Sequence, residues 1–197
     1  MNILQIFAKA PIVGKVKTRL KDAIGVLAAA DLHKQLVRHC LQKFSHIFEV
    51  QLWCYPDEFH PFFIECKTEF DINLYRQQGN DLGERMAIAL NSMNPNPTIL
   101  IGTDCPSLTV ATLQDSFAAL QQHQVVLGPA EDGGYVLIGM QQQFPELFTD
   151  ISWGSSLVLE ATRSRLSDLN LKWYETTTQW DVDRPQDLIR LKKTIIF

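Results

Sequence analysis

A single aspartate after an apolar run is the residue whose type and position most clearly suit chemistry. The run covers residues 98–103, and Asp104 follows it directly before a cysteine and a proline. Such a run is typical of a buried parallel strand, and ligands of open α/β sheets collect outside the carboxyl ends of strands. Asp104 is therefore predicted to be a catalytic carboxylate. In the structural alternative it caps the next helix, although Ser107 and Thr109 lie closer to that helix start and could also cap it.

A second acidic segment lies between two apolar stretches, residues 125–128 and 135–139. It contains Asp132 and Gly133 and is followed by Tyr135. An Asp-Gly pair suits a type I′ turn, so a plain β-hairpin is the structural interpretation. Several side chains in this turn can take part in chemistry, which favours a functional site over a plain hairpin. Asp132 is the second catalytic candidate.

Two alternating acids, Asp181 and Asp183, precede a terminal helix that is predicted to start near Pro185. Alternating side chains point the same way on an extended chain. Both carboxylates could therefore face one cation.

A basic loop follows the predicted first strand, residues 2–8, and leads into a helical pattern that extends to residue 41. Loop amides, a helix N-terminus and basic side chains together form a phosphate-binding arrangement. The loop matches neither the Walker A pattern nor the dinucleotide-binding glycine pattern, and a solvated loop capped by Thr18 is the alternative. The predicted phosphate-binding residues are Lys9, Pro11, Gly14, Lys15, Lys17 and Arg19.

A polar turn with two glycines follows the short strand predicted over residues 72–76. Gln78 and Gly79 are predicted to line a nucleobase, and Gly83 to permit close approach of the nucleotide. A simple strand-to-helix turn capped by Asp81 is the alternative.

Trp153, beside a glycine, is a candidate for stacking on a sugar or another acceptor. Its alternative is burial in the core.

The remaining reactive residue types argue against acyl transfer. None of the five histidines stands in a metal-ligand spacing, and no histidine is assigned a role. The four cysteines are scattered without a Cys-x-x-Cys pair, so neither a zinc site nor a disulfide framework is expected, and a cytoplasmic location fits. Three acidic segments and one basic loop instead favour magnesium-assisted handling of a nucleotide phosphate.

Composition limits the alternatives further. A chain of 197 residues with 46% hydrophobic residues suits one domain, and a net charge of −4 gives no general attraction to nucleic acid. No apolar run approaches the ~20 residues of a membrane span, so no integral membrane contact is expected. The sequence leaves the oligomeric state open, a homodimer included.

Five motifs, ordered along nearly the whole chain, resemble the DUF2064 family of bacterial proteins, which are usually labelled glycosyltransferases. This family is similar to the GT-A nucleotide-diphospho-sugar transferases. The motifs lie at residues 7–20, 78–86, 101–108, 127–135 and 181–188.

The resemblance implies one GT-A-like domain over residues 1–197, an α/β fold with a Rossmann-like three-layer αβα sandwich and a mixed, mostly parallel sheet. Asp104 resembles the metal-binding aspartate of GT-A proteins, with Mg²⁺ or Mn²⁺ as the cofactor. Because the sequence reads Thr-Asp-Cys where many glycosyltransferases carry Asp-x-Asp, a second ligand must come from elsewhere. Asp183 is the first choice and Asp181 the reserve.

The function expected from this resemblance is transfer of a sugar from a nucleotide-diphospho-sugar to a small-molecule acceptor. Asp132, Gly133, Tyr135 and Trp153 would face the acceptor. The basic loop is also similar to the phosphate loop of cofactor guanylyltransferases. A nucleotidyltransferase that joins a nucleoside triphosphate to a phosphorylated small molecule is therefore the second candidate, and a non-catalytic nucleotide-binding protein the third.

Overall fold

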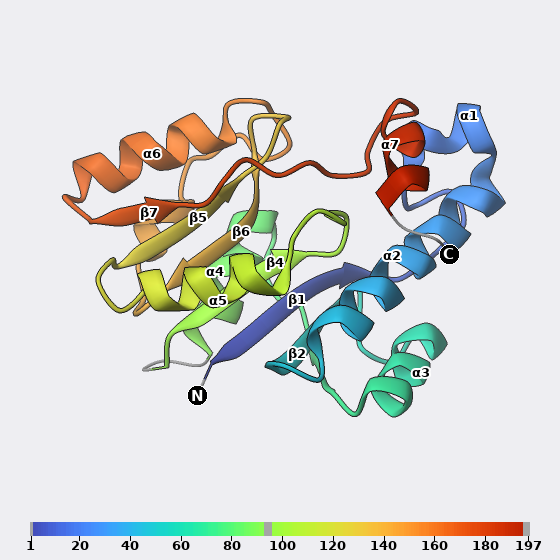
Figure 1. Cartoon of the computed structure of the whole chain (residues 1–197), viewed down its shortest axis with the longest axis horizontal. Coiled ribbons are helices and arrows are strands. Elements are labelled where there is room, and N and C mark those ends of the chain that lie inside the picture. Colours follow the sequence, from blue (N-terminus) through green and yellow to red (C-terminus); the bar gives the residue numbers. More distant parts are fainter. Residues whose placement is uncertain (1, 93–95, 195–197) are drawn as a thin grey trace.

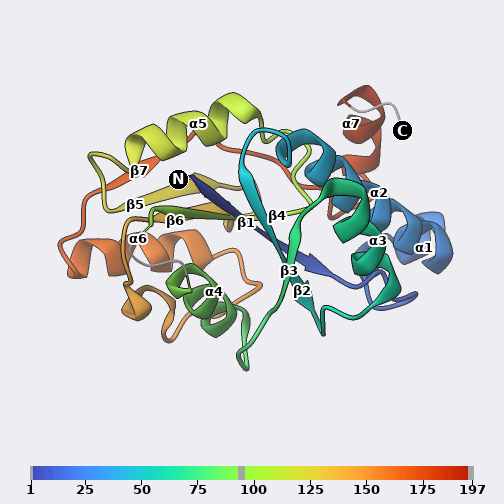
Figure 2. The same cartoon turned by 90° about the horizontal axis from the view of Figure 1, so that it is seen from below.

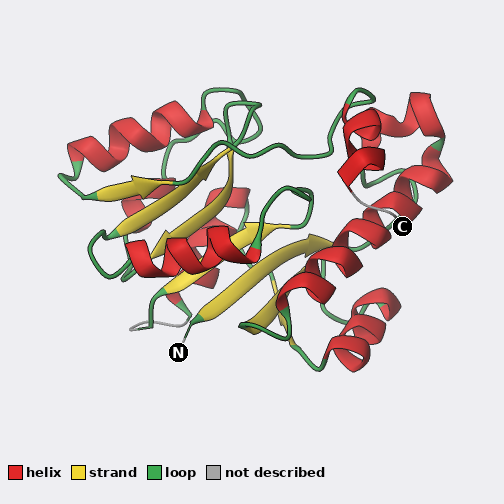
Figure 3. Ribbon diagram, in the orientation of Figure 1, coloured by secondary structure: helices red, strands yellow, loops and turns green. Residues whose placement is uncertain are grey.

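The computed structural model describes residues 2–92 and 96–194, in which a seven-stranded sheet forms the centre of the chain (Figure 1, Figure 3). The strands are β1 (Ile3–Lys9), β2 (Glu49–Tyr55), β3 (Asn73–Arg76), β4 (Thr98–Gly102), β5 (Val125–Pro129), β6 (Tyr135–Met140) and β7 (Trp173–Glu175). Their spatial order is β3-β2-β1-β4-β6-β5-β7. Only β6 among these strands runs against the others, since it pairs antiparallel with both β4 and β5. The expected mixed, mostly parallel sheet is confirmed.

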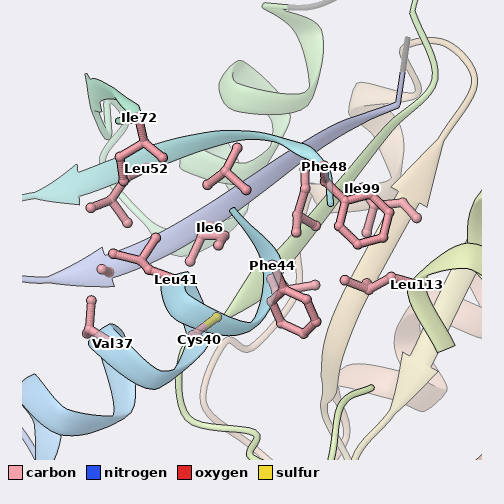
Figure 4. Packing of buried hydrophobic residues seen from close by; sticks show 14 of the residues in the cluster. Ile6, Val37, Cys40, Leu41, Phe44, Phe48, Leu52, Ile72, Ile99 and Leu113 are labelled. Carbon is pink, nitrogen blue, oxygen red and sulfur yellow. The ribbon is translucent and has the colours of Figure 1, made fainter. Parts of the chain in front are cut away.

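Helices cover both faces of the sheet, which confirms the expected three layers (Figure 2). Apolar residues of α2, α3 and α5 pack on one face, and those of α4 and α6 pack on the other. Figure 4 shows the first of these cores, where Val37, Leu41 and Phe44 of α2 point toward Ile6 and Leu52 of the sheet. The helices are α1 (Lys21–Ile24), α2 (Val26–Phe44), α3 (Pro61–Phe70), α4 (Leu82–Asn91), α5 (Val110–Ala119), α6 (Val158–Asp168) and α7 (Asp187–Thr194).

The strand order reverses between β1 and β4. The chain moves outward from β1 through β2 to β3 and then returns to place β4 on the other side of β1. Crossovers on opposite sides of the sheet leave a crevice at the carboxyl ends of such strands, where ligands of open α/β sheets bind. Both the basic loop and Asp104 follow these two strand ends.

A long segment, residues 176–186, crosses this edge of the sheet on its way from β7 to α7 (Figure 1). Trp180 and Val182 are buried with Leu36 of α2 and Leu191 of α7 in a third, smaller core. The Val182 amide donates to the Asp104 carbonyl at 2.8 Å. These contacts fix Asp181 and Asp183 close to the end of β4.

No helix within residues 2–92 and 96–194 combines the length and the apolar character needed to cross a membrane.

Candidate active site

A cavity of about 430 Å³ lies at the crevice between β1 and β4. It brings four of the predicted phosphate-binding residues together with two of the predicted acids, although these six come from three distant parts of the chain. Its polar lining residues are Lys9, Lys15, Lys17, Thr18, Arg19, His33, Gln77, Thr103, Asp104 and Asp183.

The basic loop is shaped by two residues in the left-handed region of backbone space. Gly14 has φ 75°, which glycine adopts without steric cost, whereas Lys17 has φ 48° and ψ 40°. Such a conformation is uncommon for a side chain of this size and persists only where surrounding contacts hold it. Pro11 is buried at the start of the loop, while Lys15 and Arg19 are exposed toward solvent.

Lys17 is buried and is paired with Asp104. Its Nζ lies 2.8 Å from Asp104 Oδ2, and it also donates to the Val182 carbonyl. Only 3% of the Lys17 side chain is exposed, compared with 43% of the Asp104 side chain. Lys17 thus ties the basic loop, the end of β4 and the segment 176–186 together, and its ammonium group holds the Asp104 carboxylate.

Asp104 is charged and accessible from the cavity. Burial raises its pKa, but the basic groups around it, above all the charge and hydrogen bond of Lys17, outweigh burial, so the net pKa is lowered. Thr109, and not Asp104, caps α5, since its hydroxyl accepts from the Thr112 amide at 3.0 Å. The capping alternative for Asp104 is therefore wrong.

The other acids gather beside Arg19. Arg19 forms an ion pair with Asp183, and both line a second, acidic cavity of about 520 Å³ together with Asp132 and Asp181. Burial, and then the charges of Asp132 and Asp183, raise the pKa of Asp181 to about 6. The charged residues that line this cavity are five carboxylates and two arginines: Glu131, Asp132, Asp181, Asp183, Asp187, Arg19 and Arg184.

His33 of α2 is a site residue that the sequence analysis missed. It is buried, it lines the main cavity, and its Nε2 lies 2.9 Å from the Lys9 carbonyl. Burial lowers the pKa of His33, and the opposing pull of Asp104 is weaker, so the ring is neutral at pH 7. The available signal was a polar residue among the apolar positions of the first helix.

Gln77 and not Gln78 lies in the cavity wall. The Gln77 side chain is buried and donates to the Trp53 carbonyl at 2.8 Å. Gln78 and Gly79 are exposed and lie outside the residues that line the cavity. The proposed alternative for this turn also holds, because Asp81 caps α4 by accepting from the Glu84 amide at 2.8 Å.

Gly83 and Trp153 pack on each other and do not line the cavity. A Cβ on Gly83 would lie 2.6 Å from the Trp153 ring, which also stacks near Phe148 with centroids 6.4 Å apart. The structure therefore accounts for Gly83 through packing, and Trp153 is half-buried in the second core.

Gly83→Ala is expected to lower the free energy of unfolding by about 1–3 kcal/mol, because the added methyl group has no room beside Trp153. Gly102→Ala is the matched control, since its Cβ would enter open space, and it should change stability by less than ~1 kcal/mol. Urea denaturation followed by tryptophan fluorescence measures both. Equal stability of the two variants would contradict this packing role.

The hairpin between β5 and β6 carries Asp132, Gly133 and Tyr135, and the predicted hairpin is confirmed. The turn is not of type I′, because Gly133 has a positive φ but Asp132 does not. Asp132 Oδ1 accepts from the Gly134 amide at 2.9 Å. Gly133 has φ 88°, and a Cβ there would meet the Ser156 carbonyl at 2.2 Å, so it packs against the start of α6. Tyr135 lines a third cavity, of about 310 Å³ and mainly apolar, whose wall also includes Asp104 and Asp181.

The acidic residues fit a cation that a phosphorylated ligand would share. Among the described residues, no group of three or more His, Cys, Asp or Glu side chains is arranged to hold a metal ion by itself. Mg²⁺ needs only one or two carboxylates when phosphate oxygens and waters supply the rest. The surplus of carboxylates over arginines in the second cavity would suit such an ion.

Comparison with known proteins identifies the family. Residues 36–155 match the family model described as "Uncharacterized protein conserved in bacteria (DUF2064)". The chain belongs to the DUF2064 family. A crystal structure from Desulfovibrio desulfuricans G20, provisionally named a nucleotide-diphospho-sugar transferase, is 30% identical to this DUF2064 protein with a TM-score of 0.90. The match covers 98% of this chain and 87% of that one. No curated protein matches the chain by sequence.

More distant structures share the fold of this DUF2064 protein. A cytidylyltransferase from Leptospira borgpetersenii is 15% identical, with a TM-score of 0.60 over 97% of this chain and 84% of its own. Glucosyl-3-phosphoglycerate synthase from Mycobacterium tuberculosis, in complex with Mn²⁺, UDP and glucosyl-3-phosphoglycerate, is 9% identical. Its TM-score is 0.54 over 96% of this chain and 75% of its own. The fold is therefore that of nucleotidyl- and glycosyltransferases.

Proposed function

We propose that this DUF2064 protein is a metal-dependent transferase that uses a nucleotide-diphospho-sugar donor. One observation carries the proposal: a single cavity at the reversal of strand order joins basic side chains from the first loop to Asp104 and Asp183. The basic side chains can bind a diphosphate, and the two carboxylates can bind a divalent cation that the diphosphate also contacts. The 30% identity to a protein provisionally named a nucleotide-diphospho-sugar transferase supports the same class.

In this proposal Lys9, Lys15 and Arg19 bind the diphosphate, and Lys17 holds Asp104 in place. Asp104, with Asp181 or Asp183, would hold Mg²⁺ or Mn²⁺. When bound, the ion would supply a positive charge that stabilises the departing nucleoside diphosphate. Mechanisms of this kind need positioning and electrostatics, without a covalent intermediate.

The acidic cavity beside Arg19 is proposed to receive the acceptor. Five carboxylates against Arg19 and Arg184 in its wall favour an uncharged or cationic acceptor, because the surplus negative charge would repel a phosphate group. Asp132 would accept the acceptor's proton or stabilise positive charge that develops on the sugar ring. Gly133, Tyr135 and Trp153 remain predicted acceptor-side residues, and Gln78, Gly79 and Gly83 remain predicted nucleotide-side residues.

The second candidate, nucleotidyl transfer to a phosphorylated small molecule, is favoured by the density of basic residues in the first loop. It would use the same metal and the same diphosphate contacts. The acidic cavity supports nucleotidyl transfer less well, because the phosphorylated acceptor of that reaction would be repelled by the carboxylates.

A thermal-shift screen of nucleotides and nucleotide sugars, with and without Mg²⁺, tests the proposal. Ligand at ~100 times its Kd adds about 2.7 kcal/mol of stability, which raises Tm measurably. A metal-dependent shift with one nucleoside diphosphate sugar, lost in Asp104→Asn, is expected. A shift with triphosphates alone would favour nucleotidyl transfer, and no shift with any nucleotide would contradict both. Binding without product release would favour the third candidate, a nucleotide-binding protein.

Lys15→Ala is expected to weaken nucleoside diphosphate binding about tenfold, because it removes one charge-assisted contact to phosphate. Stability should not change, since Lys15 is exposed. Lys34→Ala is the matched control, an exposed lysine of α2 outside the cavity lining. Calorimetric titration of both variants decides the point, and equal affinities would remove Lys15 from the site.

A further inference from the structure

The mainly apolar cavity of about 310 Å³ adjoins the main cavity at the ends of β1 and β4. Phe7, Leu82, Gly102 and Asp104 line both cavities. A Cβ on Gly102 would have no atom within 4 Å, so this part of the shared wall faces open space. A ligand held in the main cavity can therefore extend into the smaller one, which we call the apolar cavity.

Hydrocarbon side chains form most of the apolar cavity. Met86 of α4, Leu100 of β4 and Ile138 of β6 line it and are buried in the second core. The phenol oxygen of Tyr135 is buried, so the ring of this residue and not its hydroxyl is available to a ligand. The volume lies at the lower end of the range of about 300–1,000 Å³ that is typical of ligand pockets, so the cavity suits a small group.

The charged side chains of the apolar cavity are shared with the other two cavities. Asp104 also lines the main cavity, and Asp181 also lines the acidic cavity. The sulfur of Cys105 is paired with the Ser107 hydroxyl at 3.3 Å. A charged carboxylate accepts hydrogen bonds and donates none. A group that occupies this cavity should therefore donate hydrogen bonds toward the two aspartates and present hydrocarbon to the rest of the wall.

We propose that the sugar of the donor binds in the apolar cavity and is a 6-deoxyhexose, which has a methyl group where the parent hexose has a hydroxymethyl group. The sugar is bonded to the diphosphate, so it must occupy a space that adjoins the main cavity. The acidic cavity is assigned to the acceptor, which leaves the apolar cavity for the sugar. This inference rests on the proposed function, which supplies the diphosphate and the place of the acceptor.

The methyl group is what the apolar wall distinguishes. A hydroxyl that enters such a wall loses its hydrogen bonds to water and finds no partner, whereas burial of a methyl group is favourable. The ring hydroxyls of the sugar can still donate toward Asp104 and Asp181. Because Asp181 lines both the apolar and the acidic cavity, a sugar placed here also lies next to the acceptor, as transfer requires.

Binding of a 6-deoxy donor and of its parent hexose on the same nucleoside diphosphate tests the inference without any turnover. The base is the one selected by thermal shift; for uracil, UDP-glucose, UDP-galactose and UDP-mannose are each paired with their 6-deoxy analogue. Each donor is titrated by calorimetry into wild-type protein with Mg²⁺. In the pair that binds most tightly, we expect the 6-deoxy donor to bind at least about tenfold more tightly than its parent, a ratio that small apolar pockets achieve.

Met86→Gln places an amide in the wall of the apolar cavity. It is expected to reduce the ratio at least about threefold, because the amide gives the extra hydroxyl a hydrogen-bond partner. Met140→Gln is the matched control, since Met140 is also 4% exposed in the second core but does not line the apolar cavity. It should leave the ratio unchanged. A ratio that is the same in folded Met86→Gln as in wild type would place the sugar elsewhere and overturn the inference.

Failure of the inference and failure of the proposed function give different results. If the nucleoside diphosphate binds and the parent hexose donors bind as tightly as the 6-deoxy donors, the inference is overturned and the proposed function stays intact. If neither the nucleoside diphosphate nor any donor binds, both are overturned. The comparison in wild type decides between these outcomes even if Met86→Gln folds poorly.

Discussion

Asp104→Asn is expected to reduce turnover of the nucleotide sugar by at least about 1000-fold while the chain stays folded. Asparagine keeps the shape of the side chain but removes the charge that would hold a divalent cation in the cavity. Loss of a metal that neutralises the leaving group costs several kcal/mol, and ~4 kcal/mol corresponds to that factor. Release of nucleoside diphosphate from the donor identified by thermal shift is the measurement.

Asp115→Asn is the matched control for this prediction, since Asp115 is exposed on α5 and does not line the cavity. It should retain wild-type turnover. Turnover in Asp104→Asn within tenfold of wild type would mean that Asp104 is not a metal ligand in the reaction. Circular dichroism of both variants shows whether a loss reflects chemistry or unfolding.

Lys17→Met is expected to lower the free energy of unfolding by about 2–3 kcal/mol and to reduce turnover as well. Removing one member of a fully buried ion pair costs ~3–5 kcal/mol, and the 43% exposure of the Asp104 side chain places this case below that range. Turnover falls because Asp104 loses the contact that orients it and the segment that carries Asp183 loses its link to the loop. Urea denaturation measures the first effect.

A double-mutant cycle with Asp104→Asn isolates the ion pair. The double variant is expected to be more stable than the sum of the two single changes predicts, by about 1–2 kcal/mol, because residues in direct contact couple. Lys15→Met serves as the control, since Lys15 is exposed and should couple to Asp104 by less than ~0.5 kcal/mol. Additive effects of Lys17→Met and Asp104→Asn would mean that Lys17 does not position the carboxylate.

The sequence was sufficient to predict the fold and the meeting of charged loops. An apolar run that ends in an acid predicted β4 and the place of Asp104, because parallel strands release their carboxyl ends at one edge of a sheet. The same argument placed the basic loop at the end of β1. The segment with Asp181 and Asp183 could be assigned to this edge only through its resemblance to a family, since nothing local in it specifies contact with Asp104.

Features that depend on contacts between distant elements could not be predicted. The burial of Lys17 depends on a left-handed backbone position and on Val182, 165 residues away. His33 faces Asp104 because α2 packs on the sheet beside β4, a contact that no local pattern specifies. Gln77 lines the cavity and Gln78 does not, because neighbouring residues of an extended chain point to opposite sides, and a sequence pattern does not say which of the two faces inward.

The packing of Gly83 against Trp153 joins residues from different helices and loops, which no local pattern encodes. The sequence predicts a ligand role for both residues because glycine permits close approach to a ligand and tryptophan can stack on one. A glycine also occurs beside a tryptophan in a protein core, because the absence of a side chain leaves room for the ring.

Calorimetric titration of a nucleoside diphosphate into wild type, with and without Mn²⁺, tests the central claim most directly. The base is the one selected by thermal shift. We expect binding that requires the ion and weakens at least about tenfold in Asp104→Asn and in Lys15→Ala, which change opposite sides of one cavity. Affinity that is independent of the ion and of both substitutions would contradict a nucleotide site between β1 and β4.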